Sequence, residues 1–166
     1  ITILFLVNTN NIGKNIIKRV DVFNENFSKY KNIDEKKFWA SVRKLKTEGY
    51  FVTTINSITP TIVYGNKPYI LNVRDLDHIP YHPGTAKEVK NIIENIYGLD
   101  FNNPPKKYVG GLKDEWYKEI FEERSQKIWS SLSEEFNLSG IIIPNNWNLK
   151  INKNFSYDKF AIYLMK

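Results

Sequence analysis

The feature that most constrains the fold is a short, wholly apolar segment that directly follows a strongly amphipathic one. Residues 140–144 read Gly-Ile-Ile-Ile-Pro, and three consecutive isoleucines leave this stretch without a polar face. Such a strand is typical of a sheet that is covered on both faces. The preceding segment, about Lys113 to Phe136, predicts one long helix. Its apolar stripe is Trp116, Ile120, Phe121, Ile128, Trp129, Leu132 and Phe136.

The same order of helix and strand occurs earlier in the chain. Asp34 is placed to cap a helix with an apolar stripe, and we expect Gly49 to take the left-handed position after its end. An apolar, β-branched stretch over Tyr50–Ile55 predicts the strand that follows. Alternating helices and strands predict an α/β fold, with a mixed, partly parallel sheet flanked by helices. We expect residues 1–166 to form a single compact domain.

Weaker patterns predict the remaining elements. Residues 61–64 and 69–73 are expected to be short strands joined by a turn at Gly65-Asn66. Residues 149–151 and 160–165 are expected to close the sheet as an antiparallel pair. A further helix is expected from a capping box at Thr85–Glu88 to Gly98, with the apolar face Val89, Ile92, Ile93 and Ile96.

Composition excludes several classes of site. The chain has no cysteine, so a disulfide scaffold, a thiolate zinc site and a cysteine nucleophile are all excluded. The glycine-rich phosphate loops, the serine nucleophile elbow and the helical zinc-protease motif are missing as well. The net charge is +6, but lysine outnumbers arginine twenty to four, and the four arginines are scattered among acidic residues. We therefore expect no nucleic-acid partner, because base recognition relies largely on arginine.

The first residues form a separate question. Ile1–Val7 is an apolar run, far shorter than the roughly 20 residues that span a bilayer. It is either a buried first strand or the stub of a transmembrane helix. Both interpretations stand at this level.

The chain's two histidines lie in one segment, Arg74–His82, together with two aspartates. Carboxylates and imidazoles are metal ligands, and His78 and His82 are four positions apart. Pro80 and Pro83 argue against a helix, so the two rings need not share a face. The alternative is a surface loop in which the aspartates make turns. We assign no metal ligand and expect no cofactor.

Ligands of open α/β sheets bind beyond the carboxyl ends of parallel strands. The predicted strands place three segments there, residues 54–57, 72–82 and 145–148, which we call the carboxyl rim. Amides, carboxylates and an aromatic face suit a sugar or another polyol. The predicted ligand-binding residues are Asn56, Arg74, Asp75, Asp77, His78, Tyr81, His82, Asn145 and Trp147.

Four stretches carry a family resemblance: FWASVRKLKTEGYFVTT, NIIENIYGLDFNNPP, EERSQKIWSSLSEEFNLSGIIIPNNWNLKI and the terminal FAIYLMK. Over residues 35–166 the chain resembles the soluble C-terminal domain of large bacterial polytopic membrane proteins. These proteins are of the C-type glycosyltransferase and surface-polysaccharide assembly kind. Their catalytic acids sit in loops between membrane helices, which this chain lacks, so no catalytic residue carries over. The resemblance favours the transmembrane stub for Ile1–Val7.

The leading hypothesis is an accessory or ligand-positioning domain on the extracytoplasmic (periplasmic) face of a bacterial membrane, working in glycan or polysaccharide assembly. Its partners would be the membrane-embedded remainder of the same protein and a sugar or polyprenyl-linked glycan. This segment alone is not expected to be catalytic. Two alternatives stay open: a small enzyme that uses the Arg74–His82 loop, with or without the help of a metal, and a basic nucleic-acid-binding module.

Overall fold

The structure is a computed structural model that describes residues 33–73, 76, 83–105 and 112–165. The chain divides into two units, residues 1–36 and residues 37–166. Only the first turn of one helix belongs to the described part of the first unit, so the fold below is that of the second. The prediction for Ile1–Val7 lies outside the described residues, and the single domain stays a prediction.

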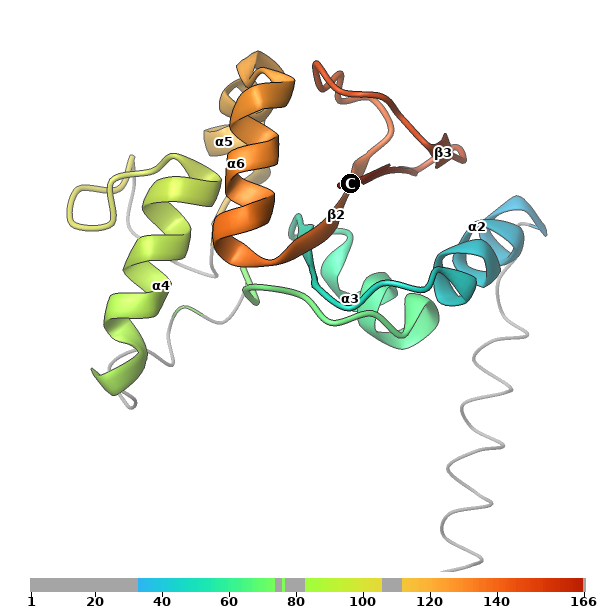
Figure 1. Cartoon of the computed structure of the whole chain (residues 1–166), viewed down its shortest axis with the longest axis horizontal. Helices are drawn as coiled ribbons and strands as arrows, with labels where there is room; N and C mark the ends of the chain where they lie inside the picture. The colour runs from blue at the N-terminus through green and yellow to red at the C-terminus, as the bar shows by residue number, and fades with distance from the viewer. Residues whose placement is uncertain (1–32, 74–75, 77–82, 106–111, 166) are drawn as a thin grey trace, which may run out of the picture. The chain divides into compact units, whose positions relative to one another are not determined.

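A mixed sheet forms the centre of the second unit (Figure 1). Its strands in the described ranges are β1 (Tyr50–Thr53), β2 (Leu138–Pro144), β3 (Phe155–Ser156) and β4 (Phe160–Leu164), in the order β1-β2-β4-β3. β1 pairs with β2 in parallel, whereas β4 is antiparallel to both β2 and β3. The predicted mixed, partly parallel α/β fold is confirmed.

Helices surround this sheet in the part of the chain that the structure describes. They are α2 (Ile33–Lys44), α3 (Ile58–Pro60), η1 (Thr61–Gly65), η3 (Pro83–Thr85), α4 (Ala86–Ile92), η4 (Ile93–Tyr97), α5 (Asp114–Glu123) and α6 (Gln126–Phe136). No helix in the described ranges has both the length and the apolar character needed to cross a bilayer.

Two hydrophobic clusters on opposite faces explain the three isoleucines of β2. Ile141 and Ile143 belong to a cluster with residues of α4, η4, α5 and α6. Ile142 belongs to the other, which includes Phe38 and Trp39 of α2. Successive side chains of a strand point to opposite faces, so both faces of β2 are buried. Figure 1 shows α2 and the α4–α6 group on different sides of β2.

The predicted long helix over 113–136 is in fact two helices. Arg124 has extended backbone angles, φ −62° and ψ 130°, and ends α5. The hydroxyl of Ser125 accepts a hydrogen bond from the backbone N–H of Ile128 and caps α6. The break carries no glycine or proline, and the apolar stripe continues through it, so periodicity alone does not reveal it.

The predicted hairpin over residues 61–73 is wrong. Residues 58–65 are helical, and the Thr61 hydroxyl donates to the Ser57 carbonyl oxygen at 2.7 Å. Asn66, with φ 48°, ends that helix in the left-handed region and does not form a strand turn. The predicted strand at 69–73 is reduced to one parallel bridge between Tyr69 and Phe51.

Two further predictions need correction. Residues 149–151 do not pair with 160–165; Lys150 instead bridges Ser125, and β3 supplies the antiparallel partner of β4. The helix before Gly98 is present, and Gly98 ends it with φ 70°. Its capping box does not form, because the Thr85 side chain makes no capping hydrogen bond.

Gly49 is needed because the backbone there lies very close to the backbone of Asn137. The predicted left-handed conformation of Gly49 is wrong. Among the described residues, φ is positive only at Asn66, Gly98 and Asn137. The Gly49 N–H donates to the Ser139 hydroxyl at 2.7 Å, and the Tyr50 N–H donates to the Asn137 carbonyl oxygen at 2.9 Å. A Cβ at Gly49 would lie 2.2 Å from that same carbonyl oxygen.

The variant Gly49→Ala therefore tests the parallel pairing. The clash is with backbone, so we expect a loss of at least about 2 kcal/mol in the free energy of unfolding, measured by urea denaturation. Gly84→Ala is the control, since a Cβ there meets nothing within 4 Å. Its effect should stay within about 0.5 kcal/mol. Equal effects of the two substitutions would contradict the close approach.

Candidate functional site

Of the predicted carboxyl rim, the structure describes residues 54–57 and 145–148 in full, and residues 72, 73 and 76 of the third segment. Thr53 lies opposite Ile142 in the parallel pair, so the segments that follow β1 and β2 leave the sheet at the same edge. Asn56 follows β1 and is exposed, while Asn145 and Trp147 follow β2. The predicted rim residues Arg74, Asp75, Asp77, His78, Tyr81 and His82 lie outside the described residues, so that part of the rim stays a prediction.

Asp114, at the start of α5, contacts the carboxyl rim, and the sequence did not single it out. Its Oδ1 accepts hydrogen bonds from the Ile55 backbone N–H at 3.0 Å and from the Tyr117 hydroxyl at 2.6 Å. The Asn56 amide lies 3.5 Å from its Oδ2. The carboxylate thus ties the end of β1 to α5, which is a structural task.

Trp147 and Asn145 are engaged in the fold. The Trp147 side chain is only 3% exposed, and its ring packs edge-on against Tyr117 and Phe121, at centroid distances of 5.7 and 5.8 Å. It therefore offers no open aromatic face for a ligand. The Asn145 amide oxygen accepts a hydrogen bond from the Lys153 ammonium at 3.0 Å. Within the described residues, no group of three acidic or histidine side chains is arranged to hold a metal.

Two buried tyrosines lie behind the rim. The Tyr97 hydroxyl donates to the Thr53 carbonyl oxygen at 3.1 Å, and the rings of Tyr97 and Tyr117 meet edge-on at 4.9 Å. Burial raises the pKa of Tyr97, and the charge of Asp114 adds to the increase. Burial likewise raises the pKa of Tyr117, with smaller contributions from Tyr97 and Asp114.

These raised pKa values predict a loss of stability at high pH. The unfolded tyrosines ionise near pH 10, whereas the folded ones hold their protons to higher pH. Below about pH 10 both tyrosines are protonated in the folded and the unfolded chain, so their ionisation does not lower the free energy of unfolding. Above that pH, the free energy of unfolding should fall by about 1.4 kcal/mol per pH unit for each buried tyrosine. Urea denaturation between pH 9 and 11.5 measures this slope. Tyr97→Phe should make it shallower, and an unchanged slope would contradict the assignment.

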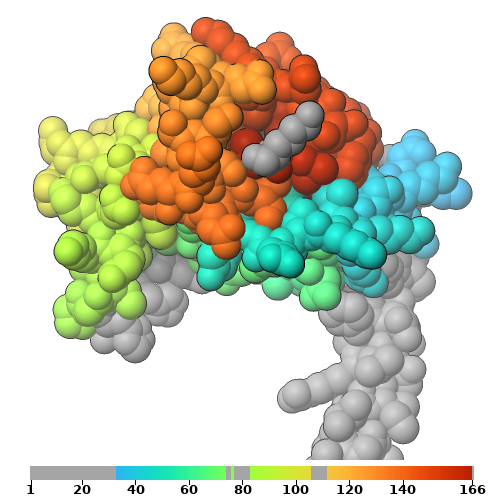
Figure 2. Space-filling view, viewed as in Figure 1, coloured from blue at the N-terminus to red at the C-terminus, as the bar shows by residue number. Residues whose placement is uncertain are grey.

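A pocket of about 270 Å³ lies between α6 and two later segments, residues 151–154 and 164–165, and we call it the α6 pocket. On the face shown in Figure 2, the atoms of α6 (orange) adjoin those of the C-terminal stretch (red), although they are distant in sequence. The described residues that line the pocket are Gln126, Trp129, Ser130, Ile151, Asn152, Asn154, Leu164 and Met165.

Three local features build the α6 pocket. Gln126, Trp129 and Ser130 are spaced i, i+3 and i+4, which puts them on one side of α6. The bridge between Ser125 and Lys150 brings the following segment, 151–154, against the start of that helix. The Asn154 amide oxygen then accepts a hydrogen bond from the Leu164 N–H at 2.6 Å, which attaches the segment to the end of β4.

The lining combines uncharged polar groups with apolar walls. The side chains of Gln126, Ser130 and Asn152 make no hydrogen bond to other described residues, so a ligand can use them. None of the described lining residues has an ionisable side chain. The sequence did not predict this site, because asparagines are frequent throughout the chain and only the fold brings these few together.

Arg124 holds one wall of the α6 pocket. The sequence indicates a solvated face at Glu122-Glu123-Arg124, but the Arg124 guanidinium donates to the carbonyl oxygens of Asn95, at 2.8 Å, and Ile96. It also lies over the Trp129 ring at 5.1 Å. Burial lowers the pKa of Arg124 to about 10. The cation therefore joins η4 to α6 and holds Trp129 in place.

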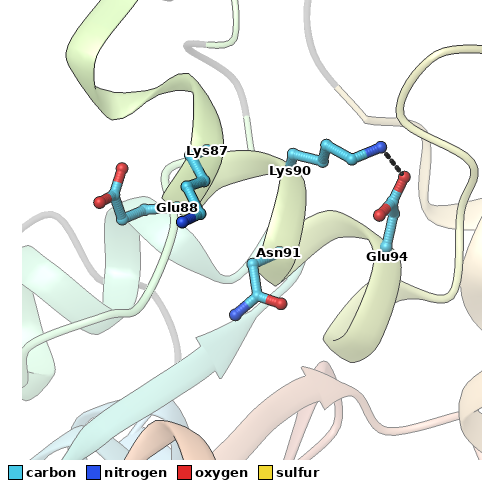
Figure 3. Close-up of a pocket in the computed structure, with 5 residues that line it drawn as sticks. All are labelled: Lys87, Glu88, Lys90, Asn91 and Glu94. Carbon is cyan, nitrogen blue, oxygen red and sulfur yellow. Dashed lines mark hydrogen bonds and ion pairs between the residues drawn. The ribbon is translucent and has the colours of Figure 1, made fainter.

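A larger hollow, of about 400 Å³, lies over α4 and η4, but the side chains that line it are less suited to hold a ligand. All its described lining residues, Lys87, Glu88, Lys90, Asn91 and Glu94, come from that one helical segment (Figure 3). Lys90 and Glu94 point toward each other and form an exposed ion pair at 2.7 Å. This is the pattern of a solvated helix face.

Comparison with known proteins adds no relative. No family model, no curated protein and no solved structure matches the chain.

Proposed function

We propose that this chain is a binding domain without catalytic activity of its own, which holds a neutral sugar unit in the α6 pocket. The observation that carries the proposal is the lining of that pocket, where free amide and hydroxyl groups face a space bounded by apolar side chains. Small-molecule sites have this composition, with apolar walls and a few polar groups that fix the orientation.

The chemistry of the lining favours a polyol. A carboxamide offers both donors and an acceptor, and so matches hydroxyl groups that do the same. Gln126 supplies such a group from α6 and Asn152 supplies one from the segment 151–154, and Ile151 and Met165 supply surface for the C–H face of a sugar ring. General acid–base catalysis needs a titratable group near the reacting atoms. The described lining has none, so binding is favoured over reaction.

The proposed setting is the extracytoplasmic, periplasmic face of a bacterial membrane. There the domain would position a polyprenyl-linked sugar or an acceptor glycan for the membrane-embedded remainder of the same protein. The resemblance of residues 35–166 to C-terminal domains of polysaccharide-assembly proteins supports this setting, as does a pocket suited to a neutral sugar. The gene tests it: an upstream reading frame without several hydrophobic spans would contradict it.

Replacing Asn152 with alanine tests the binding site. The loss of one hydrogen bond to a neutral group should weaken binding of a neutral monosaccharide about 3- to 10-fold. The dissociation constants are measured by NMR titration of the whole chain with a panel of neutral mono- and disaccharides. Asn152 is exposed, so stability should change by less than about 0.5 kcal/mol.

Asn146→Ala is the matched control, because Asn146 is also an exposed asparagine but does not line the α6 pocket. It should leave the affinity unchanged. Equal weakening by the two substitutions would place the sugar elsewhere, and no binding across the panel would refute the proposed function.

A further inference from the structure

One wall of the α6 pocket contains a buried donor without an acceptor. The Trp129 side chain is fully buried, and its indole N–H has no hydrogen-bond partner among the described residues. Buried polar groups in native proteins are nearly always satisfied, and each exception calls for an explanation such as a bound molecule. Trp129 lines the α6 pocket, so a molecule bound there can bring an acceptor to this residue.

We infer that Trp129 is a specificity-determining residue and that the bound sugar carries an acetamido group, whose carbonyl oxygen accepts the indole hydrogen bond. This inference rests on the proposed function and specifies its ligand. An indole nitrogen is a donor only, so it requires an acceptor, and a carbonyl oxygen supplies one.

The other groups of the pocket complement the rest of an acetamido substituent. Its N–H needs an acceptor, and the side-chain carbonyl oxygens of Gln126 and Asn152 are free for this. Its methyl group needs an apolar surface, which Ile151, Leu164 and Met165 provide. Burying one methyl group of this size favours binding about fourfold. The hydroxyl group of glucose at the same position ends two bonds short of that carbonyl oxygen, so it would neither reach the indole N–H nor cover the apolar wall.

Access to the donor requires a movement of the wall, because the indole nitrogen is itself covered. The Trp129 ring is held by the Arg124 guanidinium stacked over it. The parts able to move are Gln126 and Met165, which are long, unbranched and not fully buried. Binding should therefore shift these two side chains and leave the indole ring where it is.

The test compares N-acetylglucosamine with glucose, by NMR titration of the full chain and of its Trp129→Phe variant. The variant keeps an aromatic ring and removes the donor. We expect the wild-type chain to bind N-acetylglucosamine at least tenfold more tightly than glucose. Trp129→Phe should lower the affinity for N-acetylglucosamine about five- to tenfold and leave that for glucose unchanged. The Trp129 indole ¹H–¹⁵N resonance should move on addition of N-acetylglucosamine to the wild-type chain.

Trp39→Phe is the matched control. Trp39 is 2% exposed, and its indole N–H also has no hydrogen-bond partner among the described residues, but it belongs to the cluster on the other face of the sheet. Trp39→Phe should change the affinity for neither sugar.

Equal affinities of the wild-type chain for the two sugars would overturn the acetamido inference and leave the proposed function standing. Equal losses of affinity for both sugars in Trp129→Phe would do the same. If the chain binds neither sugar, the acetamido inference is overturned. If it binds no sugar of the neutral panel, the proposed function is overturned as well. If Trp129→Phe fails to fold, the wild-type indole resonance decides, because a resonance that does not move overturns the inference.

Discussion

The parallel pairing of β1 with β2 is the constraint on which the rest of the structure depends. It is held at both ends: the Tyr50 N–H donates to the Asn137 carbonyl oxygen, and the Ser57 hydroxyl donates to the Ile142 carbonyl oxygen at 2.7 Å. The first contact is possible only because Gly49 has no Cβ to strike that same Asn137 oxygen. The pairing makes β2 an interior strand, and its three consecutive isoleucines need apolar layers on both faces.

The α6 pocket follows from those layers. α6 packs on one face through Trp129 and Leu132, and it leads through a left-handed Asn137 directly into β2. β4 pairs with the other edge of β2, which brings Leu164 and Met165 near the start of α6. The lining comes from three segments joined by backbone and side-chain hydrogen bonds, a support that holds a binding site in one geometry.

The sequence predicted the α/β class and the covered sheet because three consecutive isoleucines in a strand leave it no polar face to turn toward water. It failed where tertiary contacts override a local pattern. An unbroken apolar stripe hid the break at Arg124, whose half-buried guanidinium donates to backbone carbonyl groups of η4. The sequence also predicted Trp147 as a ligand-binding residue, whereas its ring packs in the core. Asn152 could not be selected, because nothing local distinguishes it from the many other asparagines of this chain.

We propose that a neutral, acetamido-bearing sugar binds in the α6 pocket, between α6 and residues 151–154 and 164–165. The most direct measurement is a map of ¹H–¹⁵N chemical-shift changes over the assigned chain on addition of N-acetylglucosamine. We expect the largest changes to cluster at Gln126–Ser130, Ile151–Asn154 and Leu164–Met165, together with the Trp129 indole. Changes confined to the segments after β1 and β2, around Asn56 and Asn145, or no changes at all, would contradict it.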